Sequence, residues 1–336
     1  MNLWQAAVEL ARAGGGALAT VARVRGSTPV PTGTKMLVGP AGRLLGTVGG
    51  GCVEADVIGA ALEAMARGRP AMLTHHLNAD LAGGVGLSCG GTVEIFVEPL
   101  IRDEAYVRVL ELAAAGEAGV VTTATDWTAG AEKRFEPLPP GAPRGEPATL
   151  TADGRFVIER LVPAPRVVVF GAGHVGGAIA RAADAAGFRV VLIDDRAEFA
   201  DPSRYPERMA VWACDVDEGM SRLGLAAGDA VVVATRGHRH DALILERVVA
   251  SAASYLGLLG SRRKAAVISK VLRGVGVPAE ALARVRVPVG LDIGAVTPEE
   301  IAVSVVAELV AWRRIPRESA GPAPAASAAN PPAAAL

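Results

Sequence analysis

The chain has 336 residues, of which 51% are hydrophobic and 21% charged, with a formal net charge of −1. This composition predicts a folded protein of two domains, and the charge balance gives no electrostatic basis for binding nucleic acid or an anionic membrane. No apolar run is long enough to span a membrane and no signal-peptide pattern opens the chain, so we expect a cytoplasmic protein with free thiols.

Short apolar runs separated by glycine and proline predict strands in the first hundred residues. These strands are residues 17–24, 36–38, 44–48 and 92–98. A helix is predicted from Cys52 or Val53 to about Arg67, because apolar residues recur along one face. His75 and His76 follow in a short polar link, where a surface role is expected.

Two glycine clusters, residues 49–54 and 89–94, each hold a cysteine and run toward a glutamate. They contain Gly49, Gly50, Gly51, Cys52 and Glu54, and then Cys89 and Glu94. Glycine lets backbone approach a ligand closely, and a thiolate is a sulfur nucleophile and a soft-metal ligand. Cys52 also falls at a helix start, where N–H groups favour the thiolate. The clusters predict a sulfur or metal site; burial as small apolar residues is the alternative for the cysteines.

A second helix is predicted over residues 102–115, and Asp153-Gly154 predicts the turn of a hairpin. Residues 163–165, Pro-Ala-Pro, mark a domain boundary. We therefore expect an N-terminal domain over residues 1–162, a C-terminal domain over 163–316 and a disordered alanine- and proline-rich tail over 317–336.

From Arg166 the pattern changes to strands alternating with amphipathic helices, which predicts a parallel sheet covered on both faces. The predicted strands are residues 166–170, 189–194, 209–213, 229–235 and 255–259. Further on, Thr297, Pro298 and Glu300 have the spacing of a helix N-cap with a capping box. The fold class is α/β: a C-terminal Rossmann-like parallel-sheet domain preceded by a smaller mixed α+β glycine-rich domain.

A glycine-rich turn follows the first strand of this second half. It holds Gly171, Gly173, His174 and Gly176 in a G-x-G-x-x-G pattern between a strand and a helix. Asp194 ends the next strand, at the position where an acid binds a ribose in dinucleotide sites. The turn and the acid predict a site for a nucleotide or a pterin with a phosphate; a purely structural turn is the alternative.

More polar groups follow two later strands, at the edge where open α/β sheets bind ligands. Arg236 and His238 follow the fourth strand, and Ser261 and Arg262 follow the fifth. Ser261 would cap a helix whose first turn carries three cations, which a bound anion would balance. The alternatives are a solvated basic turn and surface histidines.

Several of these segments carry a resemblance when they are taken together. They are residues 26–29, 33–36, 46–54, 88–94, 170–175, 194–196, 235–238 and 291–302. In this combination the chain resembles the XdhC/CoxI family, the accessory proteins for molybdenum hydroxylases such as xanthine dehydrogenase and carbon monoxide dehydrogenase.

The resemblance implies a cofactor chaperone rather than a stand-alone enzyme. Such a protein binds molybdenum cofactor (molybdopterin), supports its sulfuration with a cysteine desulfurase and inserts it into a xanthine dehydrogenase-type hydroxylase. It also implies a homo-oligomer, most simply a dimer. We expect the cofactor phosphate at the Gly171–Gly176 turn and at Ser261, and Cys52 near the molybdenum as ligand or sulfur relay, with Cys89 and Glu54 beside it.

Two other functions remain open on the sequence. The glycine turn and Asp194 also fit an NAD(P)-dependent oxidoreductase, which would transfer hydride without any molybdenum enzyme. A nucleotide-binding regulatory module without chemistry is the other, and in it the cysteines would be inert.

Overall fold

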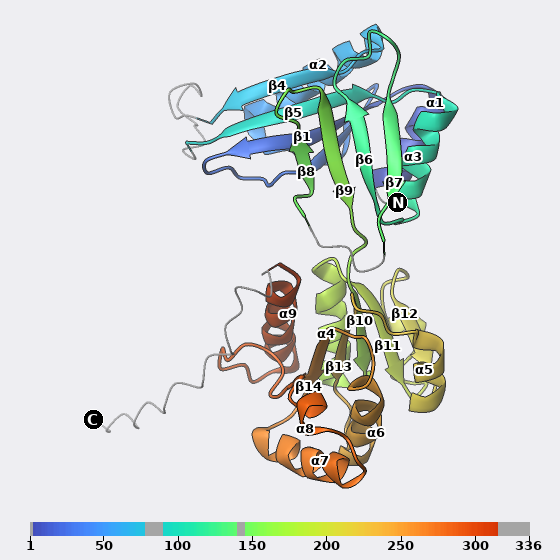
Figure 1. Ribbon diagram of the computed structural model, residues 1–336, viewed down its shortest axis with the longest axis vertical. Helices are drawn as coiled ribbons and strands as arrows, with labels where there is room; N and C mark the ends of the chain where they lie inside the picture. Colours follow the sequence, from blue (N-terminus) through green and yellow to red (C-terminus); the bar gives the residue numbers. More distant parts are fainter. Residues whose placement is uncertain (1–2, 78–89, 140–144, 315–336) are drawn as a thin grey trace, which may run out of the picture. The chain divides into compact units, whose positions relative to one another are not determined.

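The computed structural model describes residues 3–77, 90–139 and 145–314 (Figure 1). Its packing divides the chain into two compact units, Met1–Pro163 and Ala164–Leu336. Cys89 and the predicted tail over residues 317–336 lie outside the described residues. Within the described part, no helix combines the length and the apolarity that a membrane crossing requires.

The first unit is built from antiparallel strands and helices. Its elements are α1 (Leu3–Ala13), β1 (Ala17–Arg25), β2 (Lys35–Gly39), β3 (Gly42–Gly46), α2 (Gly51–Arg67), β4 (Ala71–His76), β5 (Thr92–Pro99), α3 (Glu104–Ala114), β6 (Gly119–Ala124), β7 (Lys133–Pro137), β8 (Ala148–Leu150) and β9 (Phe156–Leu161). They form a five-stranded sheet in the order β3-β2-β1-β5-β4 and a four-stranded sheet in the order β7-β6-β9-β8.

Side-chain alternation along β1 gives the larger sheet two apolar faces. Ala17, Ala19 and Val21 pack with the buried face of α2, while Leu18 packs with α1 and α3. Such alternation follows from the two-residue period of a strand. The sheet therefore separates α2 from α1 and α3.

The two sheets of the first unit are also joined by buried charges. Lys133 of β7 lies 2.7 Å from Glu98 of β5, and these side chains are 1% and 0% exposed. Lys35 of β2 forms a second ion pair across the sheets, with Glu159 of β9. Tyr106 donates a hydrogen bond of 2.9 Å to Glu98. Each buried charge thus has an opposite charge from the facing sheet, as burial of ions requires.

The second unit alternates strands and helices. Its elements are β10 (Arg166–Phe170), α4 (His174–Ala185), β11 (Arg189–Asp194), η2 (Pro202–Arg204), β12 (Ala210–Ala213), α5 (Val216–Leu223), β13 (Ala230–Val233), α6 (His238–Val248), β14 (Tyr255–Leu258), α7 (Arg262–Gly274), α8 (Ala279–Leu282), β15 (Val285–Arg286) and α9 (Pro298–Arg314).

All strands of this sheet run parallel, in the order β12-β11-β10-β13-β14-β15. Helices α4 and α9 cover one face, and α5, α6 and α7 cover the other (Figure 1). The chain order reverses between β10 and β13, which is where open α/β sheets form a crevice for ligands. This arrangement confirms the predicted fold class.

The structure confirms some of the local predictions and corrects others. The capping box is present: Thr297 Oγ1 accepts from Glu300 N at 3.2 Å, and Glu300 Oε2 accepts from Thr297 N at 3.0 Å. His75 and His76, however, lie in strand β4, where they pair with Val93 and Thr92 of β5. The sequence concealed this strand because no residue of β4 is fully buried, and Thr74 and His76 are exposed. Helix α1 was also not expected.

Candidate functional site

The glycine turn follows β10 and begins α4, as the sequence predicts, and two of its glycines have clear packing reasons. Gly171 has a φ of 103°, and a Cβ there would lie 2.5 Å from the carbonyl oxygen of Ala234. A Cβ on Gly176 would lie 1.8 Å from the oxygen of Gly171. Gly173 is the N-cap residue of α4, and as a glycine it has no side chain to accept from the N–H groups of the first turn. The turn therefore holds β10, β13 and α4 close together and leaves the start of α4 open to a ligand.

Asp194 meets the glycine turn directly. Its Oδ2 accepts from Ala172 N at 2.6 Å and from Arg196 Nη2 at 2.9 Å. Its Oδ1 accepts from Arg196 Nε at 2.8 Å and from the Arg196 backbone N–H at 3.0 Å. Burial opposes ionisation, but these hydrogen bonds outweigh it and keep the pKa of Asp194 below its ordinary value.

Arg196 is held in place on its other side by an aromatic ring. Its guanidinium lies 3.9 Å from the ring centroid of Phe199, and Phe199 makes an edge contact with the exposed His174.

The four hydrogen bonds that Asp194 accepts fill the usual acceptor capacity of a carboxylate. A ribose hydroxyl would have to displace one of them.

A cavity of about 200 Å³ opens at the carboxyl ends of β10, β11, β12 and β13. Its apolar lining includes Phe170, Ile193 and Ile244. Its polar lining includes Asp195, Asp215, Asp217, Arg196, Arg236 and His240. We call it the acid-rimmed cavity. Sequence reasoning did not single out Asp195, Asp215 or Asp217, although their positions just after β11 and β12 could have indicated them.

A smaller cavity of about 100 Å³ adjoins the start of α4. Gly173, His174, Arg181, Arg204 and Glu299 are among its lining residues. The backbone at a helix start and two arginines provide positive charge there, which suits an anion.

The turns after β13 and β14 are joined by a buried carboxylate. Asp241 of α6 accepts from Thr235 Oγ1 at 2.6 Å and lies 2.5 Å from Lys264 Nζ. Lys264 also donates to the carbonyl of Leu259. One of the three cations predicted at the start of α7 therefore has a structural role.

The other predicted residues of these turns are exposed. Arg236 precedes α6, and His238 is its first residue. Ser261 caps α7 by accepting from Lys264 N at 3.2 Å, as predicted, and Arg262 begins that helix. Of these residues, Arg236 lines the acid-rimmed cavity.

Cys52 lies at the start of α2 in the first unit and is exposed, which excludes burial as its fate. Gly49, Gly50 and Gly51 precede it with φ values of 136°, 75° and 60°. Glu54, in the first turn of α2, accepts a hydrogen bond from Thr47 Oγ1. The helix start thus presents a thiol on a glycine-rich loop, beside a carboxylate that already has a partner.

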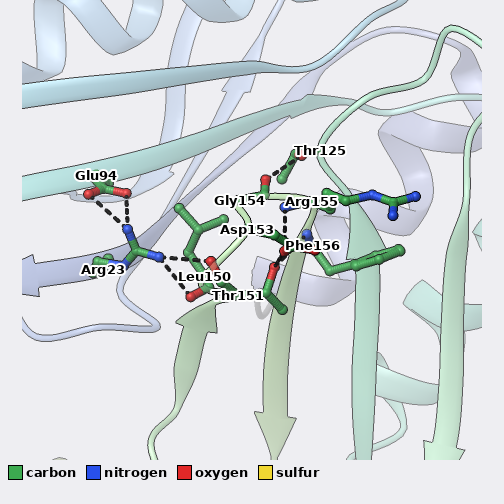
Figure 2. Close-up of polar contacts among 9 residues, drawn as sticks. All are labelled: Arg23, Glu94, Thr125, Leu150, Thr151, Asp153, Gly154, Arg155 and Phe156. Atoms are coloured by element: carbon green, nitrogen blue, oxygen red, sulfur yellow. Dashed lines mark hydrogen bonds and ion pairs between the residues drawn. The ribbon is translucent and has the colours of Figure 1, made fainter.

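The second glycine cluster is described only from Gly90 onward, so the position of Cys89 stays a prediction. Its glutamate is structural: Arg23 Nη1 donates to both oxygens of Glu94, at 3.1 and 3.0 Å. The other terminal nitrogen of the same guanidinium, Nη2, donates to the carbonyls of Leu150 and Thr151, each 2.9 Å away (Figure 2). Glu94 therefore holds Arg23, and Arg23 ties the β8–β9 hairpin to β1 and β5.

The turn of that hairpin is built as its sequence predicts. Asp153 Oδ1 accepts from Thr151 Oγ1 at 2.6 Å and from Arg155 N at 3.1 Å (Figure 2). Gly154 has a φ of 72°, which glycine adopts without strain. Its carbonyl accepts from Thr125, which ties the hairpin to the end of β6.

A group of three or more histidine, cysteine, aspartate or glutamate side chains placed to hold a metal ion is absent from the described ranges. Cys214, the other described cysteine, is buried, and burial raises the pKa of its thiol. Cys52 is the thiol that a partner can reach in the described part of the chain.

Comparisons with known proteins agree with this architecture. A family model described as the XdhC Rossmann domain matches residues 167–309, and one described as the XdhC and CoxI family matches residues 10–76. The crystal structure of a xanthine dehydrogenase from Bacillus halodurans is similar with a TM-score of 0.76 at 25% identity, over 94% of this chain and 98% of that chain.

Two curated relatives are similar over most of their length. A probable subunit of xanthine dehydrogenase from Bacillus subtilis (strain 168) is 29% identical over 313 residues, which cover 88% of this chain and 93% of that protein. The molybdenum cofactor insertion chaperone PaoD of Escherichia coli (strain K12) is 27% identical over 319 residues, covering 91% of this chain and 86% of that protein. The two family models match both units, and the chain therefore belongs to the XdhC and CoxI family.

Proposed function

We propose that this protein is an accessory factor that carries molybdenum cofactor and inserts it into a xanthine dehydrogenase-type hydroxylase. The observation that carries the proposal is the similarity to PaoD, a molybdenum cofactor insertion chaperone, over 91% of this chain. The similarity to a probable xanthine dehydrogenase subunit supports the same partner class.

Cys52 is the residue that we propose for the sulfur chemistry. It is exposed at a helix start, so both the cargo and a cysteine desulfurase can reach it. A thiolate is a soft ligand for molybdenum and a carrier of sulfur, and either role would support exchange of an oxo for a sulfido ligand. Glu54, in the same glycine cluster, and Cys89, in the second glycine cluster, stay in the proposal as further candidates. We further propose that the protein works in the cytoplasm as a homodimer.

The anionic tail of the cargo needs a site in the second unit. The start of α4 with Gly173 and His174, and the arginines of the smaller cavity, suit a phosphate. Arg262 and the capped start of α7 at Ser261 supply a second basic turn, and His238 stands at the start of α6.

NAD(P) fits these residues less well. A dinucleotide site uses the acid at the end of the second strand to bind ribose hydroxyls, whereas Asp194 already accepts four hydrogen bonds from Ala172 and Arg196. The oxidoreductase is therefore the weaker proposal.

The decisive experiment is to purify the protein from cells that make molybdenum cofactor and to assay bound molybdenum and pterin. We expect both in near-stoichiometric amounts. Bound nicotinamide without molybdenum would contradict the proposal.

Replacing Cys52 by alanine tests its role directly. We expect the Cys52→Ala variant to fold normally, because the side chain is exposed, and to lose activation of the apo-hydroxylase in a reconstitution assay. Glu63→Ala is the matched control, since that side chain is exposed further along the same helix, α2, and activation should persist. Normal hydroxylase activity with the Cys52 variant would remove this thiol from the mechanism.

A further inference from the structure

We propose that the acid-rimmed cavity binds the ring edge of a 2-amino-4-oxopyrimidine, with Asp195 as the acceptor for its N–H groups. Pterins and guanine share this edge, which presents two neighbouring N–H donors and one carbonyl oxygen. The choice of a pterin rests on the proposed function; the assignment of the edge rests on the cavity itself.

The size and floor of the cavity suit a flat ring system. Its volume is about 200 Å³, smaller than the roughly 300–1,000 Å³ of sites that enclose larger ligands. The floor includes Phe170, Ile193 and Ile244, which are all buried in the sheet or in α6. Apolar walls with polar groups at the rim are typical of small-molecule sites.

The polar groups of the rim are not equivalent, because most of the acids are already committed. Asp194 accepts four hydrogen bonds, and Oδ1 of Asp215 accepts from Glu218 N at 2.8 Å to cap α5. Asp217 forms an ion pair with Arg247. Among the described carboxylates of the rim, Asp195 is the one with neither oxygen engaged by a hydrogen bond or a close ion pair.

Asp195 keeps its carboxylate open to a ligand. Its side chain is 54% exposed, and the nearest cationic atom, Nε of Arg196, lies 4.0 Å away. In the described ranges no residue donates a hydrogen bond to this carboxylate. Two carboxylate oxygens side by side match two adjacent N–H groups of a ligand, and charged acceptors make the stronger hydrogen bonds.

The cation needed for the carbonyl oxygen of the same edge lies on the same rim. Arg236 follows β13, is exposed and lines the cavity. Its guanidinium donates no hydrogen bond to any residue in the part of the chain that the structure describes. An acid and an arginine on one rim therefore complement the donor–donor–acceptor pattern, whereas adenine, with one exocyclic amino group and no N–H beside it, offers no such pair.

The test is calorimetric titration of the full-length protein with 6-hydroxymethylpterin, GMP and NAD⁺. We expect the pterin to bind, and Asp195→Asn to weaken it about ten- to hundredfold, because the amide turns a donor toward the ligand's donors. Arg236→Gln should weaken it as well. The matched control is Glu246→Gln, an exposed acid of α6 that does not line the cavity, and it should leave the affinity unchanged.

Each other outcome overturns a defined part of the inference. GMP binding more tightly than the pterin, with the same loss in Asp195→Asn, would replace the pterin by a guanine nucleotide. NAD⁺ as the preferred ligand, or pterin binding that Asp195→Asn does not change, would overturn the inference altogether, as would the absence of binding by all three probes.

The failure of this inference is separable from failure of the proposed function. If both the wild type and the Asp195→Asn variant co-purify with molybdenum cofactor in equal amounts, the cavity assignment fails while the proposed function stands. If the wild type binds the pterin probe through Asp195 and never carries molybdenum, the cavity assignment stands while the proposed function fails.

Discussion

Glu159 illustrates how single residues of the first unit depend on partners from another strand. Burial opposes its ionisation, but Lys35 and Lys133 stabilise the carboxylate more strongly, so the pKa of Glu159 lies below its ordinary value. A lowered folded-state pKa means that the contribution to stability is present above the ordinary carboxyl pKa, near pH 4.5, and is lost as the pH falls through the folded-state pKa.

We expect Glu159→Gln to lower the free energy of unfolding at pH 7 by about 3–5 kcal/mol, because it leaves Lys35 buried without its ion pair. The variant should also lose less stability than the wild type between pH 5 and acid, as seen in denaturant titrations across that range. The double variant Lys35→Met/Glu159→Leu removes both charges and should recover most of the stability at pH 7. Equal stability and equal pH dependence in Glu159→Gln and wild type would contradict this account.

At the scale of elements, glycines in helices have opposite roles depending on what surrounds them. Gly176 in α4 cannot carry a Cβ without meeting the oxygen of Gly171 at 1.8 Å. Gly59 lies within α2, and a Cβ there would meet nothing within 4 Å. The first glycine is required by packing, while the second costs helix stability.

We expect Gly176→Ala to lower the free energy of unfolding by at least about 1–3 kcal/mol, because the backbone at Gly171 would have to move away from the new methyl group. Gly59→Ala should raise it by about 0.5–1 kcal/mol, because alanine is the better helix former. Chemical denaturation of both variants measures the difference. Similar effects of the two substitutions would mean that the glycine turn is not tightly packed.

On the scale of the whole molecule, each unit has its own hydrophobic cores. The clusters built on α4, α9 and α6 lie within the second unit, and those built on α1, α2 and α3 lie within the first. A unit of this size is within the range of domains that fold alone.

We therefore expect a fragment of residues 164–336 to unfold cooperatively by itself in a thermal melt followed by circular dichroism. In the full chain, Glu159→Gln should shift the transition of the first unit and leave that of the second unchanged. A fragment that melts without a cooperative transition would show that the second unit needs the first for its fold.

The sequence by itself determined the features that rest on local pattern. The features that follow from periodicity and from residue types within a few positions are the apolar strands of the parallel sheet, the glycine turn before α4, the start of α2 within one or two residues of Cys52, and the capping box at Thr297. Strand β4 lacks that periodicity, because none of its residues is fully buried and Thr74 and His76 are exposed, and it was not predicted for that reason.

Only the tertiary structure decided which polar groups remain available for a ligand. Glu94 is committed to Arg23, 71 positions away, and Asp194 is committed to Ala172, 22 positions away. Asp195 and Arg236 share one cavity because parallel pairing aligns the carboxyl ends of β11, β10 and β13 at one edge of the sheet. Hydrogen bonds between distant strands saturate some carboxylates and spare others, and no local spacing in the chain encodes that choice.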